Sequence, residues 1–208
     1  MTEGTERINA LSDGVFAIAV TLLILEVKVP HPGPGESMGP ALAALWPSYV
    51  AFGLSFFVIL VTWIAHHDLM RLVRGTNIPL QIANGAALAY VTFIPFPTAV
   101  LAENLGGPNL STAVALYCGT FVFGSVAFNI LAEVIARNHL VRNDVDPTAI
   151  QRIRKGYHIT LAVYIAATLI ALVQPYLALV INVAVRLHLL RVHHVAASLP
   201  RPEPLAKG

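Results

Sequence analysis

Apolar runs of about the length of a transmembrane helix fill almost the whole of this 208-residue sequence. A helix that crosses a bilayer needs about 20 mostly apolar residues. Only 12% of the residues are charged, about half the share of a soluble domain. We therefore predict an all-α membrane protein with six transmembrane helices and no separate soluble domain. We place these helices at roughly 8–29, 43–66, 79–102, 111–136, 157–173 and 175–193.

The basic residues predict how these helices are oriented. If the N-terminus is cytoplasmic, 12 of the 13 Lys and Arg residues fall on the inner side, with Arg186 counted at the inner end of the last helix, and only Lys28 falls outside. Short cytoplasmic loops carry such an excess because basic residues resist translocation. Five or seven helices would lose much of this asymmetry, so we expect both termini to be cytoplasmic.

The remaining composition excludes several classes of protein. We expect a transmembrane domain at 1–194 and a disordered, polar cytoplasmic tail at 195–208. The first residues, MTEGTER, lack the basic start of a cleaved signal peptide. The formal charge is only +2, and no stretch resembles a nucleic-acid-binding segment. A single cysteine, Cys118, rules out an intrachain disulfide.

The first predicted helix has two unlike faces when its residues are placed at 100° intervals. The face opposite its apolar stripe carries Asn9 and Asp13, with Ser12 and Phe16 on its flanks. A carboxylate near a membrane end needs a partner or water, and it marks a candidate functional position. Arg7 lies about two-thirds of a turn away around the helix, so we expect the partner of Asp13 to come from another helix. The apolar stripe consists of Leu11, Gly14, Ile18, Thr21, Leu22, Leu25 and Val29.

Candidate partners occur at the same membrane depth on the second and third predicted helices. We expect a polar network that would fix the first helix rigidly to its own subunit, so that the apolar stripe faces something else. The predicted members of this network are Arg7, Ser12, Asp13, Trp63, His66, His67 and Asn84.

Three motifs make the sequence similar to a known family. The pattern R-x-x-x-[FL]-S-D-G begins at Arg7, W-x-x-H-H begins at Trp63, and Asn84 is followed by PFPT at 95–98. In this order and spacing the chain resembles bacterial members of the transmembrane protein 175 family, relatives of a lysosomal potassium channel. The resemblance covers roughly residues 7–100, and beyond them it rests on the number of helices. Leu11 stands where the family usually has phenylalanine.

The resemblance implies a homotetramer of six-helix subunits in a bacterial cell membrane, with the first helix of each subunit around a central pore. It implies a potassium-preferring cation channel without a TVGYG filter, and the sequence contains no TVGYG. The implied constriction consists of Ile18 and Leu25, with Thr21 or Leu22 between them. Apart from other copies of the chain and lipid, the implied partner is the permeating K⁺ ion, and no cofactor is expected.

A ring of isoleucines offers no ligand to a cation, so a narrow ring would exclude water and gate the pore by dewetting. K⁺ holds its water less tightly than Na⁺, so dehydration at such a ring favours K⁺. We expect Ile18 to form the tightest point and the Thr21 hydroxyl to form a weak polar site.

Other interpretations of the same residues stay open at this point. The stripe could be an ordinary packing surface, and the polar network could be purely structural. Asp13 with His66 or His67 could also sense protons, since histidine titrates near neutral pH. The adjacent histidines point about 100° apart and lack the i, i+4 spacing of a zinc helix, which argues against a metal site.

A proton-coupled secondary transporter is the alternative function. Transporters often carry internal repeats and broken helices near the midplane. The motif that begins at Arg7 occurs once, and the acidic residues lie near predicted helix ends. No serine–histidine pair, aspartate pair or H-E-x-x-H lies deep in the predicted helices, so we do not expect an enzyme.

Overall fold

The computed structural model describes residues 3–197, and it describes side chains for residues 3–190 except Pro147 and Ala149. Of the tail expected at 195–208, residues 198–208 lie outside the described part, and 195–197 belong to the last helix. The helical elements, in chain order, are α1 (Glu3–Leu22), the short 3-10 helix η1 (Leu23–Glu26), α2 (Met38–Ala44), α3 (Trp46–Arg71), α4 (Ile78–Phe93), α5 (Pro95–Asn104), α6 (Leu110–Arg137), α7 (Pro147–Ala171) and α8 (Pro175–Ala197).

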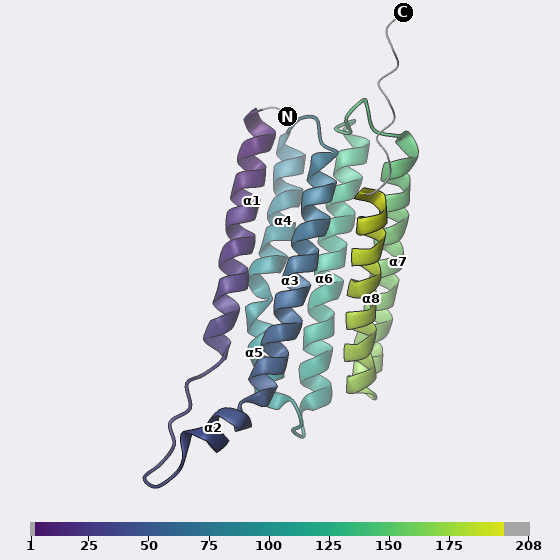
Figure 1. Cartoon of the computed structure of the whole chain (residues 1–208). Coiled ribbons are helices and arrows are strands. Elements are labelled where there is room, and N and C mark those ends of the chain that lie inside the picture. Colours follow the sequence, from purple (N-terminus) through teal and green to yellow (C-terminus); the bar gives the residue numbers. More distant parts are fainter. Residues whose placement is uncertain (1–2, 198–208) are drawn as a thin grey trace, which may run out of the picture.

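The long helices stand side by side in one bundle, with α5 continuing the line of α4 (Figure 1). α6 occupies the centre and packs against α4, α5, α7 and α8. α1 lies at one edge of the bundle, against α3 and α4. The start of α1 and the end of α8 lie toward the same end of the bundle (Figure 1).

Four helical segments within the described residues are long and apolar enough to cross a membrane: Glu3–Glu26, Trp46–Arg71, Ile78–Asn104 and Leu110–Arg137. The apolar part of α8, Pro175–Leu190, is shorter. α7 carries Arg152, Arg154 and Lys155 in its first part, which lowers its hydropathy. The chain is thus a multi-pass helical membrane protein, and the count of six spans stays a prediction.

α7 begins ten residues earlier than its predicted start at 157. The segment between the helices predicted at 111–136 and 157–173 is a loop only at 138–146. The reason is an N-cap at Asp146, whose carboxylate accepts hydrogen bonds from the backbone N–H of Thr148 at 2.8 Å and from its hydroxyl at 2.6 Å. The Thr148 hydroxyl and backbone N–H lower the pKa of Asp146. Pro147 then fits the first helical position because its missing N–H would lack a partner there anyway.

The helix predicted at 79–102 is also not continuous. It breaks at Ile94 between α4 and α5, because Pro95 has no backbone N–H with which to extend the ladder. The loops that precede α4 and α7 pair with each other as a short antiparallel bridge. Arg74 N donates to Leu140 O at 2.8 Å, and Arg142 N donates to Leu72 O at 2.9 Å.

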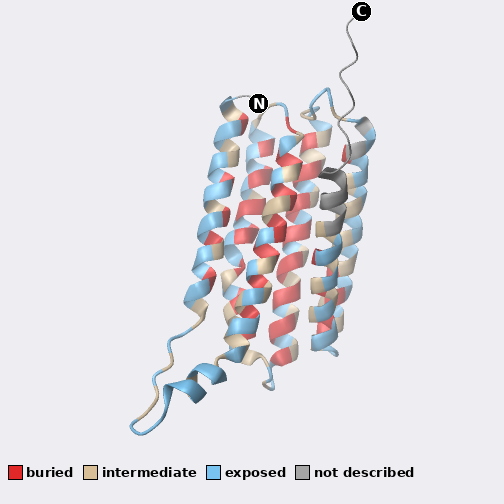
Figure 2. Ribbon diagram, in the orientation of Figure 1, coloured by how far each residue is buried: buried red, intermediate tan, exposed pale blue. Residues whose placement is uncertain are grey.

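Buried positions gather along the inner faces of α3, α4 and α6 (Figure 2). The contact between α4 and α6 depends on Gly124, because a Cβ at this position would overlap the ring of Tyr90. This close approach lets the buried Tyr90 side chain lie between the helices.

Gly124→Ala should therefore destabilise the protein, and we expect a lower thermal unfolding midpoint in detergent. Overpacking of a tight interior costs about 1–3 kcal/mol. Gly119→Ala is the matched control in the same helix, since its Cβ would meet only the Thr168 methyl at 3.8 Å. Equal midpoints for the two variants would contradict the proposed role of Gly124.

Candidate pore-lining helix and its polar anchor

One face of α1 is buried against its own subunit. Ser12, Phe16 and Ala19 of α1 and Leu23 of η1 are buried, and their spacing of three and four residues keeps them on one side of the helix. α1 packs there against α3 and α4, and η1 packs against α3 and α5.

This buried face differs from the one predicted. The sequence placed Asn9 and Asp13 opposite the apolar stripe, with Ser12 and Phe16 on the flanks. In the structure Ser12 and Phe16 lie on the buried face, Asn9 is half-buried and Asp13 is exposed at its edge. Small and apolar side chains fit against α3 and α4, whereas a carboxylate is more stable at the rim, where water can reach it.

The stripe of apolar residues on α1 faces away from the subunit. Ile18 is 59% exposed, Leu22 43% and Leu25 62%, and Leu11 and Val29 are also exposed. The Thr21 side chain is exposed as well, and its hydroxyl bonds the backbone carbonyls of Ala17 and Ile18 at 3.0 and 2.9 Å. α1 is the least buried of the four membrane-length segments.

The 3-10 helix η1 carries the next exposed position of this stripe, Leu25. Leu25 lies within η1, three residues after Leu22. Side chains three residues apart eclipse one another in a 3-10 helix. The helix predicted to continue to residue 29 thus ends as a 3-10 turn at Glu26.

A chain of buried hydrogen bonds anchors the N-terminal half of α1. The Ser12 hydroxyl donates to Ile8 O at 2.8 Å, so its oxygen remains free to accept. Asn84 of α4 donates to this oxygen at 3.1 Å and turns its carbonyl oxygen to His66 of α3 at 2.7 Å. Because an amide oxygen only accepts, this geometry assigns the proton to His66 Nε2. The rings of Phe16 and His66 pack beside the chain, 5.4 Å apart.

A second contact lies at the edge of the same face. Trp63 Nε1 donates to Asp13 Oδ1 at 2.8 Å. The His67 ring packs against Trp63, with centroids 5.7 Å apart. The structure thus brings together Ser12, Asp13, Trp63, His66, His67 and Asn84. Among the described residues, the hydrogen bonds that join this cluster to α1 come from Ser12 and Asp13 and do not include the exposed Arg7.

Arg186 does not lie at the end of the last helix, where the sequence analysis counted it. α8 extends from Pro175 to Ala197, so Arg186 lies halfway along it and is only 6% exposed. Arg186 donates to the Thr62 hydroxyl at 3.0 Å and to the Tyr90 hydroxyl at 3.3 Å. Its guanidinium also lies over the rings of Phe121 and Tyr164. A single arginine well inside an apolar run was the sequence signal for this position.

No group of three or more His, Cys, Asp or Glu side chains in the described part of the chain is arranged to hold a metal ion. Hydrogen bonds and apolar contacts dominate the cluster on α1, and the exposed stripe offers no charged group. The arrangement is typical of a membrane helix that is fixed on one side and presents its other side to a partner or a pore.

The fold and this helix define a class: helical membrane proteins in which an apolar face of the first helix is left open. The model of the family described as endosomal/lysosomal potassium channel TMEM175 matches residues 7–95. A potassium channel of Chamaesiphon minutus is 41% identical over 177 residues, which cover 84% of this chain and 87% of that protein. The chain belongs to the TMEM175 family.

A solved structure supports the same assignment over nearly the whole fold. The crystal structure of a lysosomal potassium-selective channel TMEM175 homolog from Chamaesiphon minutus matches with a TM-score of 0.83 and 36% identity, covering 92% of this chain and 99% of that one. The human protein named endosomal/lysosomal proton channel TMEM175 is 38% identical over 98 residues, 43% of this chain and 19% of that protein. The resemblance stated from the sequence motifs is therefore confirmed.

Asn84→Ala should loosen α1 because it leaves the buried His66 and Ser12 side chains without their partner. An unsatisfied buried polar group costs about 1–3 kcal/mol. We expect faster hydrogen exchange along α1 and a lower unfolding midpoint. Asn138→Ala is the control, since its exposed amide bonds only Val134 O of its own helix. Unchanged exchange along α1 would show that the network does not hold it.

Proposed function

We propose that this protein is a potassium-preferring cation channel in which α1 lines the pore. In this proposal the channel is a homotetramer in a bacterial cell membrane, each subunit spans the membrane six times, and both termini are cytoplasmic. The observation that carries the proposal is the division of α1 into an anchored polar and small-residue face and an exposed apolar stripe. The exposed apolar stripe of α1, at the edge of the bundle, must face an apolar environment or a space that excludes water.

The direction of the two faces supports a pore more than a simple packing surface. Hydrogen bonds from α3 and α4 fix the rotation of α1 about its own axis. In a cyclic tetramer every subunit presents the same surface to the symmetry axis. If the stripe of one α1 faces this axis, the stripes of all four copies meet there. Ile18 and Leu25 would then form apolar rings, with Thr21 or Leu22 between them.

Apolar rings conduct only when water and ions enter them, so such a pore gates by dewetting. K⁺ releases its water more readily than Na⁺, which gives the proposed preference its direction. The Thr21 hydroxyl proton is directed to the helix backbone, so its oxygen lone pairs are left to meet a cation. This weak site would assist entry without replacing a full carbonyl filter.

The names of relatives differ in the ion they specify, potassium for the bacterial relative and proton for the human one. We propose potassium for this chain because the bacterial relative covers most of its length. A proton-coupled transporter is the alternative, and flux that saturates and requires a proton gradient would replace the channel proposal.

The first test is Ile18→Asn in planar bilayers under a potassium/sodium gradient. Replacing the apolar ring by amides should raise conductance and move the reversal potential toward zero, because dehydration then discriminates less. The wild type should reverse near the potassium equilibrium potential. An unchanged conductance and reversal potential in Ile18→Asn would exclude Ile18 as the constriction.

A second test uses Ile18→Cys with silver ions, which are close to K⁺ in size and bond to thiols. Silver should block the Ile18→Cys current, because a pore-facing thiol meets every permeating ion. The native Cys118 is buried and should not react. Ile165→Cys, an exposed apolar position on α7 at the far side of the bundle (Figure 1), is the control. Equal block of both variants would argue against a pore along α1.

A further inference from the structure

Arg186 is a buried cation without a carboxylate partner among the described residues. None of the ion pairs formed within the described residues includes Arg186. Its contacts are two hydroxyl groups and two aromatic rings. These groups supply dipoles and ring quadrupoles but no net negative charge. A charge in the interior of a membrane protein is expensive unless it is paired, so the site calls for a counter-ion.

Two buried hydrogen-bond donors at or near the guanidinium group have no partner among the described residues. Arg186 Nε and the Tyr164 hydroxyl are buried and have no hydrogen-bond partner among the described residues. Arginine has only donors, so it cannot receive the Tyr164 proton. The Tyr90 oxygen accepts from Arg186 at 3.3 Å, which leaves its own proton to be donated elsewhere.

These three side chains line the same cavity between α3, α4, α6, α7 and α8. Ser125 and Thr160 also line it, and it leaves about 40 Å³ for the centre of a water-sized particle. The Thr160 hydroxyl is used by Gly156 O at 2.9 Å. The cavity is therefore lined by one charged N–H and one phenolic O–H group that have no partner among the described residues, and by the Tyr90 hydroxyl, whose oxygen already accepts from Arg186.

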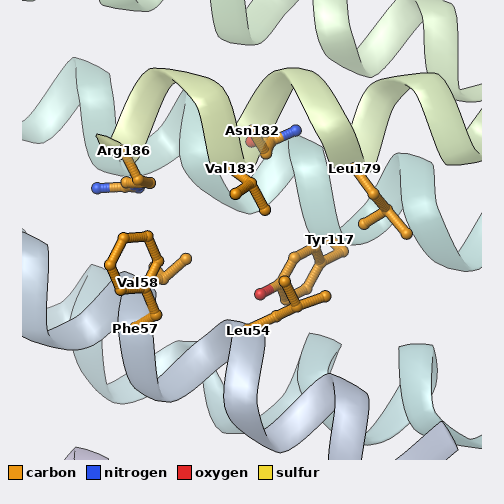
Figure 3. A pocket seen from close by; sticks show the side chains of 8 residues that line it. All are labelled: Leu54, Phe57, Val58, Tyr117, Leu179, Asn182, Val183 and Arg186. Carbon is orange, nitrogen blue, oxygen red and sulfur yellow. The ribbon is translucent and has the colours of Figure 1, made fainter. Parts of the chain in front are cut away.

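Arg186 also lines a second cavity, but its guanidinium group points away from the other residues of that lining. In Figure 3 the guanidinium nitrogens lie on the side away from Asn182, Tyr117 and Leu179. The Arg186 stem forms part of the wall there, together with apolar side chains such as Leu54 and Phe57. Asn182, whose buried Oδ1 accepts no hydrogen bond from the described residues, lines this second cavity, whereas Tyr90 and Tyr164 line only the first one.

We propose that the cavity beside Tyr164 binds a small monovalent anion of the size of chloride. The anion would accept hydrogen bonds from Arg186 Nε, the Tyr164 hydroxyl and the Tyr90 hydroxyl, and it would neutralise the guanidinium. Water could fill the same space, but it would leave the positive charge uncompensated. A phospholipid head group does not fit, because Arg186 lies halfway along α8 and is almost fully buried.

This site is separate from the proposed pore. Its lining comes from α3, α4, α6, α7 and α8 and includes no residue of α1. It could be occupied whether or not α1 lines a conduction path, so its test does not depend on the channel proposal. Its role would be to complete the core of each subunit, which predicts that the anion stabilises the fold.

The test is a bromide titration of the purified full-length protein in detergent, with potassium and ionic strength held constant by potassium gluconate. Anything that binds only the folded state raises the unfolding midpoint by mass action. We expect a saturable rise with bromide in the wild type. Tyr164→Phe should weaken the apparent bromide affinity about tenfold, the effect of one lost hydrogen bond to a charged group. Tyr176→Phe, an exposed position on the same helix as Arg186, should match the wild type.

Crystals grown with bromide provide a direct readout, since its anomalous signal should appear within hydrogen-bond distance of Arg186 Nε. A wild type that shows no saturable rise would overturn the proposal and assign the cavity to water. So would a Tyr164→Phe variant with unchanged affinity, or bromide found only on the protein surface.

Discussion

The hydrogen-bond chain from Ser12 through Asn84 to His66 fixes the rotation of α1, and the proposed function depends on that rotation. Rotating α1 by one residue, 100°, would turn Ser12 out of contact and move Ile18 to a new direction. In this arrangement the Ser12 hydroxyl donates to Ile8 O, and its oxygen accepts from Asn84. Tight coupling of a buried polar network to one geometry is the reason that such networks specify structure.

The other half of the bundle is organised around a different polar group. Arg186 reaches α3 and α4 through hydrogen bonds and lies against rings from α6 and α7. Gly124 contributes by letting Tyr90 approach α6. α3 and α4 belong to both clusters, since they supply Trp63, His66 and Asn84 on one side and Thr62 and Tyr90 on the other. A displacement of the side chains in one cluster would therefore reach the other cluster through α3 and α4, which contribute to both.

Local sequence signals account for part of the fold and miss the rest for identifiable reasons. Hydropathy identified the long helices because the length of an apolar run is set by bilayer thickness. It missed the first part of α7, where Asp146 and Pro147 form a helix start that polarity concealed. It also misplaced Arg186, because a rule about loop charges assumes that every arginine stays near water, whereas Thr62, Tyr90 and two aromatic rings provide a buried site.

The sequence by itself determined the class of the protein, its family and most members of the cluster on α1, because rare polar residues in apolar helices leave few possible partners. Only the tertiary structure decided which of them meet. Asn84 forms hydrogen bonds with both His66 and Ser12, and Trp63 donates to Asp13. None of these hydrogen bonds includes Arg7. It also decided that Arg186 lies in the core beside free donors. These outcomes depend on contacts between helices far apart in the chain, and helical periodicity describes only one helix at a time.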